Sequence, residues 1–148
     1  MSYIWLTRIL LFAVVLVAAR KGGEPERLTA AVLLTTFVLD LVNHAVFGDP
    51  VWYAVNPGHV VIDSWAFCAL LSIALYANRG WPLLVGAGQM IVMAGHVAKL
   101  WDLTMARRAY WVLTQMPFLL QLTVLLIGTV AHMNRERRIG PYQCWRWA

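Results

Sequence analysis

Ionisable and amide side chains recur at helical spacing inside apolar stretches of this sequence. Asn43 and His44 lie three and four positions after Asp40, so one face of a helix would carry all three. His59 and Asp63 are four positions apart and would share a face in the same way. Charged groups cost roughly 2.5–3.5 kcal/mol each to insert into lipid, so these residues suggest a binding or proton-handling role.

A second polar series follows along the chain, made of Gln89, His96, Lys99, Asp102 and Gln115. If five successive segments cross a membrane, all of these residues except Gln89 lie in the same half of it as the first series. The opposite half consists almost entirely of Leu, Val, Ile and Ala. This asymmetry is the most informative feature of the sequence.

Two interpretations of the polar residues involve a bound cofactor. The imidazoles and carboxylates of Asp40, His44, Asp63 and His96 would suit zinc, manganese or iron, although no HExxH or similar short motif is present. Alternatively, His44 and His96 lie at similar predicted depth on two helices, as axial ligands of a b-type haem or a chlorophyll-like pigment would.

Two further interpretations need no cofactor. Interhelical hydrogen bonds and ion pairs, such as Asp40 or Asp63 with Lys99 or Arg8, would satisfy groups that lipid cannot. The same His and Asp residues could instead form a proton or solute path. Five helices are few for a complete transporter, however, and no pair of helices broken by Gly or Pro is evident.

The elements that must position these side chains are apolar segments. Of the 148 residues, 61% are hydrophobic and 13% are charged, whereas soluble domains carry about 25% charged residues. Segments of roughly 20 residues match a hydrocarbon core of about 30 Å, and their continuous apolarity argues against a β-barrel. We therefore predict an all-α polytopic integral membrane protein with short loops, a single transmembrane domain over residues 1–148. Its helices are expected at about 3–19, 28–47, 59–78, 81–99 and 111–133, followed by a cytoplasmic tail over 134–148.

Basic residues are unequally divided between the two predicted ends. The end that includes the tail holds Arg20, Lys21, Arg27, Arg79, Arg135, Arg137, Arg138 and Arg146; the other end holds Arg8, Lys99, Arg107 and Arg108. The positive-inside rule then predicts a cytoplasmic C-terminus and an external N-terminus in a bacterial-type inner membrane. Because the basic residues lie at helix ends, contact with anionic lipid headgroups is favoured over nucleic-acid binding.

Tryptophans are expected at the membrane interface. Their amphipathic rings prefer the headgroup level, where aromatic belts form. The residues assigned to this belt are Trp5, Trp81, Trp101, Trp111, Trp145 and Trp147.

The sequence carries no recognised catalytic motif. There is no GxSxG or SxxK pattern and no phosphate-binding glycine loop, so we do not expect an enzyme. The leading expectation is a non-enzymatic accessory or stabilising subunit of a larger membrane complex. Its partners would be membrane lipids and other membrane subunits or further copies of the chain, without nucleic acid. The alternative is an independent membrane protein that binds a metal, haem or pigment through the polar cluster.

Overall fold

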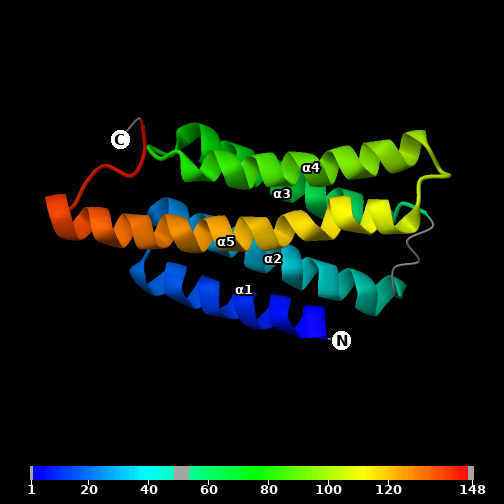
Figure 1. Cartoon of the computed structure of the whole chain (residues 1–148), viewed down its shortest axis with the longest axis horizontal. Coiled ribbons are helices and arrows are strands. Elements are labelled where there is room, and N and C mark those ends of the chain that lie inside the picture. Colours follow the sequence, from blue (N-terminus) through cyan, green and yellow to red (C-terminus); the bar gives the residue numbers. More distant parts are fainter. Residues whose placement is uncertain (1, 49–53, 147–148) are drawn as a thin grey trace.

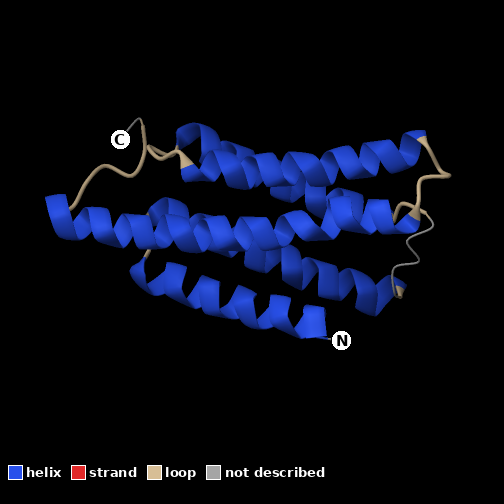
Figure 2. Ribbon diagram, viewed as in Figure 1, coloured by secondary structure: helices blue, strands red, loops and turns tan. Residues whose placement is uncertain are grey.

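The computed structural model describes residues 2–48 and 54–146, and every regular element in these ranges is an α-helix. The five helices are joined by short connections, as Figures 1 and 2 show. The helices are α1 (Ser2–Lys21), α2 (Glu24–Phe47), α3 (Pro57–Tyr76), α4 (Trp81–Trp101) and α5 (Arg107–Ile139). The predicted all-α bundle is confirmed.

The five helices form a closed ring. Each helix packs against its neighbours in the sequence, and α5 closes the ring by packing against α1. In Figure 1, α5 lies in front between α4 and α1, and it also contacts α2. The most extensive packing joins α4 to α5, so this pair forms the framework on which the other helices are placed.

Helices α2, α3, α4 and α5 are each long and apolar enough to cross a membrane. Large apolar side chains point outward on every helix, including Ile9, Val46, Val61, Val97 and Ile127. Such a surface is compatible with a membrane-embedded protein, because hydrocarbon solvates it without cost. That α1 also crosses the membrane stays a prediction.

Every helix begins or ends outside its predicted bounds, and the extension is largest for α2 and α5. Helix α2 begins at Glu24 rather than at residue 28, because Pro25 fits the first helical turn and acidic residues there suit the helix dipole. Helix α5 runs for 33 residues and continues past 133 through polar and basic residues. Those residues form helix readily but carry no apolar signal, so hydropathy alone ends the helix too early.

The connections define two ends of the bundle. The histidine end holds the C-termini of α2 and α4 and the N-termini of α3 and α5, and the tail end holds the opposite termini together with residues 140–146. An apolar core occupies mainly the half nearer the tail end. Its members are Leu11, Val14, Ala18, Ala30, Leu33, Leu70, Val85, Leu122, Val124 and Leu125. The predicted contrast between the halves is only partial, however, because Glu26, Thr29, Thr129 and His132 are also buried nearer the tail end.

Small residues allow α4 and α5 to approach closely. A Cβ atom on Gly128 would lie 2.6 Å from Cδ2 of Trp81, and one on Gly95 would lie 3.0 Å from Cβ of Leu113. Both distances are at or below the limit for real side chains, so larger residues would push the two helices apart. This close packing brings the polar side chains of α4 within reach of α5.

Candidate metal centre

Three potential metal ligands meet at the histidine end. Asp40 and His44 project from one face near the end of α2, and His59 projects from the first turns of α3. Nε2 of His59 lies 3.1 Å from Nε2 of His44 and 3.0 Å from Oδ1 of Asp40. Nε2 of His44 lies 3.4 Å from the same carboxylate oxygen. One carboxylate and two imidazoles thus direct their donor atoms toward one point.

Hydrogen bonds orient the His44 ring and the start of α3. Nδ1 of His44 lies 3.0 Å from the carbonyl oxygen of Gly48, which can only accept, so Nδ1 carries the proton and Nε2 has the lone pair that could bind a metal. Asn56 caps α3 by accepting a hydrogen bond from the amide of Gly58 at 2.8 Å. A Cβ atom on Gly58 would collide with Asn43, so glycine permits α2 and α3 to meet here.

The cluster opens onto a cavity, the histidine pocket. Its volume is about 330 Å³, and its walls come from α1, α2, α3 and α5. Asp40, His44 and His59 line it together with Asp63, and Arg8 and Gln115 lie on other walls. The side chains of Asp40 and His44 keep 41% and 21% of their surface exposed. The candidate ligands are therefore accessible to a small ion.

A second polar group lies behind the cavity. Oδ2 of Asp63 is 2.8 Å from Nε2 of His96, and Nδ1 of His96 is 2.9 Å from the Tyr110 hydroxyl. Gln89 donates to Oδ1 of Asp63 at 3.1 Å and accepts from Gln121 at 2.8 Å. This chain of hydrogen bonds links α3, α4 and α5 in the bundle interior.

The structure divides the four predicted site residues between these two groups. Asp40 and His44 lie in the cluster with His59, whereas Asp63 and His96 pair with each other. The Asp63–His96 pair is a contact between different helices of the kind expected from the cost of lone polar groups in lipid. His96 is only 1% exposed and both of its nitrogens are hydrogen-bonded, so neither is available as a haem ligand in this arrangement.

The suggested ion pairs with Lys99 and Arg8 are absent from the described part of the chain. Lys99 is buried and donates instead to the carbonyl oxygens of Leu103 and Met105, at 2.9 and 2.8 Å. The guanidinium of Arg8 lies over the ring of Trp5, 5.5 Å from its centroid. Lys99 thus closes the α4–α5 turn, because its long side chain reaches carbonyl groups that local backbone bonding leaves open.

No family model, no curated protein and no solved structure matches the chain. The function must follow from the chemistry of its own residues.

His59 is the candidate ligand that sequence reasoning left out of the predicted metal site. Its spacing from Asp63 places both residues on one face of a helix, but the predicted ligand set contains only Asp63 of the two. Asn56, Pro57 and Gly58 start α3 directly before His59 and so aim the first turn of α3 at the end of α2. A histidine in the first turn after such a helix start was the available signal.

The tail end holds charged residues in a different setting. Glu26 and Arg79 form a buried ion pair through Oε1 and Nη1, and Trp81 donates from Nε1 to the same oxygen at 3.2 Å. Trp81, predicted to be a membrane-interface residue, therefore also joins α4 to α2. Nη2 of Arg79 contacts Sγ of Cys144 at 3.2 Å, so the tail covers the pair.

The tail folds back on the bundle. The amide of Asn78 donates to the carbonyl of Cys144 at 3.0 Å, and the amide of Arg146 donates to the carbonyl of Tyr76 at 2.9 Å. Trp145 donates from Nε1 to Glu24 at the start of α2. Residues of the tail are thus held by the chain itself, which removes the need for a partner to order them. Trp147 lies outside the described residues.

Hydrogen bonding and burial shift two pKa values in the connections. Burial raises the pKa of Tyr142 above its usual value, while the nearby Arg79 cation opposes the rise. In the α4–α5 loop, hydrogen bonds from the hydroxyl and amide of Thr104 lower the pKa of Asp102. Tyr142 therefore stays a neutral hydrogen-bonding partner for His132, whose Nδ1 lies 2.8 Å from the phenol oxygen.

Proposed function

We propose that this chain is a membrane-embedded protein that binds a divalent transition metal through Asp40, His44 and His59. The observation that carries the proposal is the mutual approach of three ligand atoms from two helices, at 3.0 to 3.4 Å. Two imidazoles and one carboxylate form a donor set common at zinc and non-haem iron sites.

The spacing of the donor atoms supports a shared ion. Ligands at about 2.0–2.1 Å from a tetrahedral metal stand about 3.3 Å apart, and a facial set on an octahedral metal stands slightly closer. The three observed separations fall in this range. A site of three protein ligands leaves at least one position for water or a small molecule, and the histidine pocket provides room there.

The environment of the ligands favours binding over a purely structural contact. His44 presents Nε2 because its Nδ1 proton is held by Gly48, which is the orientation that metal-bound histidines usually have. In addition, Asp40 supplies a negative charge that offsets the charge of the ion. The carboxylate of Asp40 is also more accessible than that of Asp63, with 41% of its side-chain surface exposed against 20%.

The test is metal analysis of the purified protein in detergent, followed by titration of the stripped protein with Zn²⁺ and, anaerobically, with Fe²⁺. We expect close to one ion per chain, and affinity at least about 100-fold weaker in His44→Ala and His59→Ala. Visible absorption of the Co²⁺ form reports whether the site is tetrahedral.

Two histidines outside the cluster provide matched controls. His132→Ala removes a histidine at the tail end, and His96→Ala removes the histidine that the sequence predicted as a ligand. Both variants should retain the ion. Equal binding by the wild type and His59→Ala would refute the proposal.

We further propose that the bundle lies in a bacterial-type cytoplasmic membrane with the tail end inside. The larger share of Lys and Arg at the tail end supports this orientation. A reporter fused after residue 148 should be active only in its cytoplasmic form; activity of an external reporter there would reverse the orientation and move the metal centre to the inner leaflet.

The role of accessory subunit stays a prediction. The outward apolar side chains fit lipid or a neighbouring subunit equally well. Metal binding and membership of a complex would use different residues, so the two functions are compatible.

A further inference from the structure

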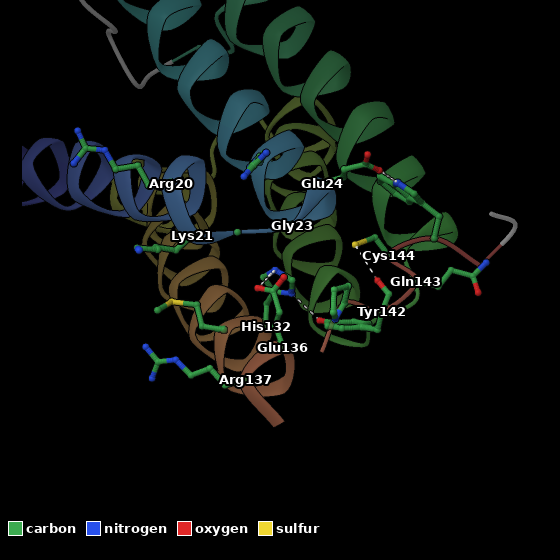
Figure 3. Close-up of a pocket in the computed structure, with 15 residues that line it drawn as sticks. Arg20, Lys21, Gly23, Glu24, His132, Glu136, Arg137, Tyr142, Gln143 and Cys144 are labelled. Carbon is green, nitrogen blue, oxygen red and sulfur yellow. Dashed lines mark hydrogen bonds and ion pairs between the residues drawn. The ribbon is translucent and has the colours of Figure 1, made fainter. Parts of the chain in front are cut away.

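A second cavity, the tail pocket, lies at the tail end of the bundle. Its volume is about 660 Å³, and its lining comes from the end of α1, the first turn of α2, the last turns of α5 and the tail. In Figure 3, Arg20, Lys21 and Arg137 lie on one side of the pocket and Gln143 and Cys144 on the other. It is therefore separate from the metal centre.

Four basic side chains line the tail pocket. Arg20, Lys21, Arg27 and Arg137 come from three helices and are all exposed. Within residues 2–48 and 54–146, none of these four forms an ion pair or a side-chain hydrogen bond. Their charges are thus available to a ligand.

The two acidic residues of the lining already have partners. Glu24 accepts a hydrogen bond from Nε1 of Trp145. Oε2 of Glu136 lies 3.8 Å from Nε2 of His132. Four basic residues face two carboxylates in the lining, so the pocket presents an excess of positive charge.

The wall opposite the cations is held in place. Backbone hydrogen bonds fix the tail to the α3–α4 connection on either side of Trp145, and Tyr142 is hydrogen-bonded to His132 of α5. Arg79 and Arg135 also lie over the Tyr142 ring, 5.1 and 4.3 Å from its centroid. The cavity therefore exists before any ligand enters it, which reduces the entropic cost of binding.

We propose that the tail pocket binds the phosphate group of an anionic ligand. Arginine and lysine form strong charge-assisted hydrogen bonds with phosphate oxygens, and several cations around one cavity can share one group. The ligand can be the headgroup of an anionic phospholipid or a soluble phosphate ester. Basic pockets at the ends of membrane helices lie at headgroup depth, where phospholipid is the more abundant source.

The experiment uses the full chain in an uncharged detergent. The thermal unfolding midpoint is followed while phosphatidylglycerol, phosphatidylcholine, glycerol 3-phosphate or inorganic phosphate is added, because a ligand of the native state raises this midpoint with concentration. We expect saturable stabilisation by phosphatidylglycerol and little by phosphatidylcholine. In the double variant Arg27→Gln/Arg137→Gln, affinity should fall at least about tenfold, since each basic residue contributes about fivefold near a membrane surface.

A second double variant controls for net charge. Arg108→Gln/Arg138→Gln removes two cations that do not line the pocket, one of them adjacent to Arg137. This variant should bind phosphatidylglycerol as the wild type does. If the two double variants lose affinity equally, or if no phosphate compound binds, the proposal is overturned.

The soluble probes identify the source of the phosphate. Saturable stabilisation by glycerol 3-phosphate or inorganic phosphate, weakened by Arg27→Gln/Arg137→Gln, would support the site and assign it to a soluble ligand. Stabilisation by phosphatidylglycerol alone would support the site and assign it to the lipid.

Discussion

At the tail end the carboxylate of Glu26 is fully buried and the Arg79 side chain is 5% exposed, whereas at the histidine end Asp40 keeps 41% of its side-chain surface. Both ends bring an acidic residue of α2 together with a nitrogen-bearing side chain from later in the chain, His59 of α3 or Arg79 of the α3–α4 connection. At the tail end a tryptophan and the folded-back tail cover the pair. At the histidine end the corresponding group faces a cavity.

This difference separates a structural role from a binding role. A sealed ion pair fixes the positions of helices and admits no ligand, while an open cluster of the same residue types is accessible to one. His96 and Tyr110 resemble the tail end in being buried, whereas their partner Asp63 is 20% exposed and also lines the histidine pocket. Stability and ligand binding should therefore respond to different substitutions.

The largest effect is expected for Glu26→Ala. This change leaves Arg79 buried without its carboxylate, which typically costs about 3–5 kcal/mol. We expect a corresponding loss in the free energy of unfolding, measured by denaturant titration in detergent micelles, with metal content per folded chain unchanged.

The control is Glu136→Ala, which removes an exposed carboxylate near the same end and should cost little. The double variant Glu26→Leu/Arg79→Leu should recover much of the lost stability, because no unpaired charge stays buried. If Glu26→Ala is as stable as Glu136→Ala, the Glu26–Arg79 pair does not have the structural role that we assign to it.

A smaller effect is expected for His96→Ala. It leaves Asp63 and Tyr110 without a shared partner in the interior, at a cost of about 1–3 kcal/mol. His44→Ala, in contrast, should cost the metal-free protein less, because His44 is partly exposed, and should weaken metal binding at least about 100-fold.

Stability and bound metal are measured for both variants. We expect His96→Ala to lose mainly stability and His44→Ala to lose mainly metal. If His96→Ala lost its metal and kept its stability, the two polar groups would form one metal site. Such a result would restore the ligand set predicted from the sequence.

Much of the fold can be predicted from patterns in the amino-acid sequence. Continuous apolar runs identify the five helices, and Gly22, Gly23 and Pro25 separate the first two. The extension of α5 to Ile139 could not be predicted from apolarity, because residues after 133 form helix without facing hydrocarbon. The return of the tail to Tyr76 and Asn78 depends on backbone hydrogen bonds that any residue type can form, so it leaves no pattern in the sequence.

The candidate site could be predicted only in part. The spacing of Asp40 and His44 places them on one face of α2 without further information. Which histidine joins them depends on the rotation of α3 and α4 about their axes, and that rotation is decided by packing between helices. Close contacts such as Gly58 with Asn43 and Gly128 with Trp81 set it, and such contacts cannot be read from one chain without its structure.

The way the tail returns to the bundle imposes an order on biosynthesis. A ribosome delivers the chain from its N-terminus, so Glu26 and Arg79 are both made before Cys144. Until residues 140–146 emerge, one wall of the tail pocket is missing and Arg79 lacks its contact with the thiol. A chain interrupted within residues 140–146 would contain all five helices yet stay unclosed at one end, where quality-control proteases could recognise it.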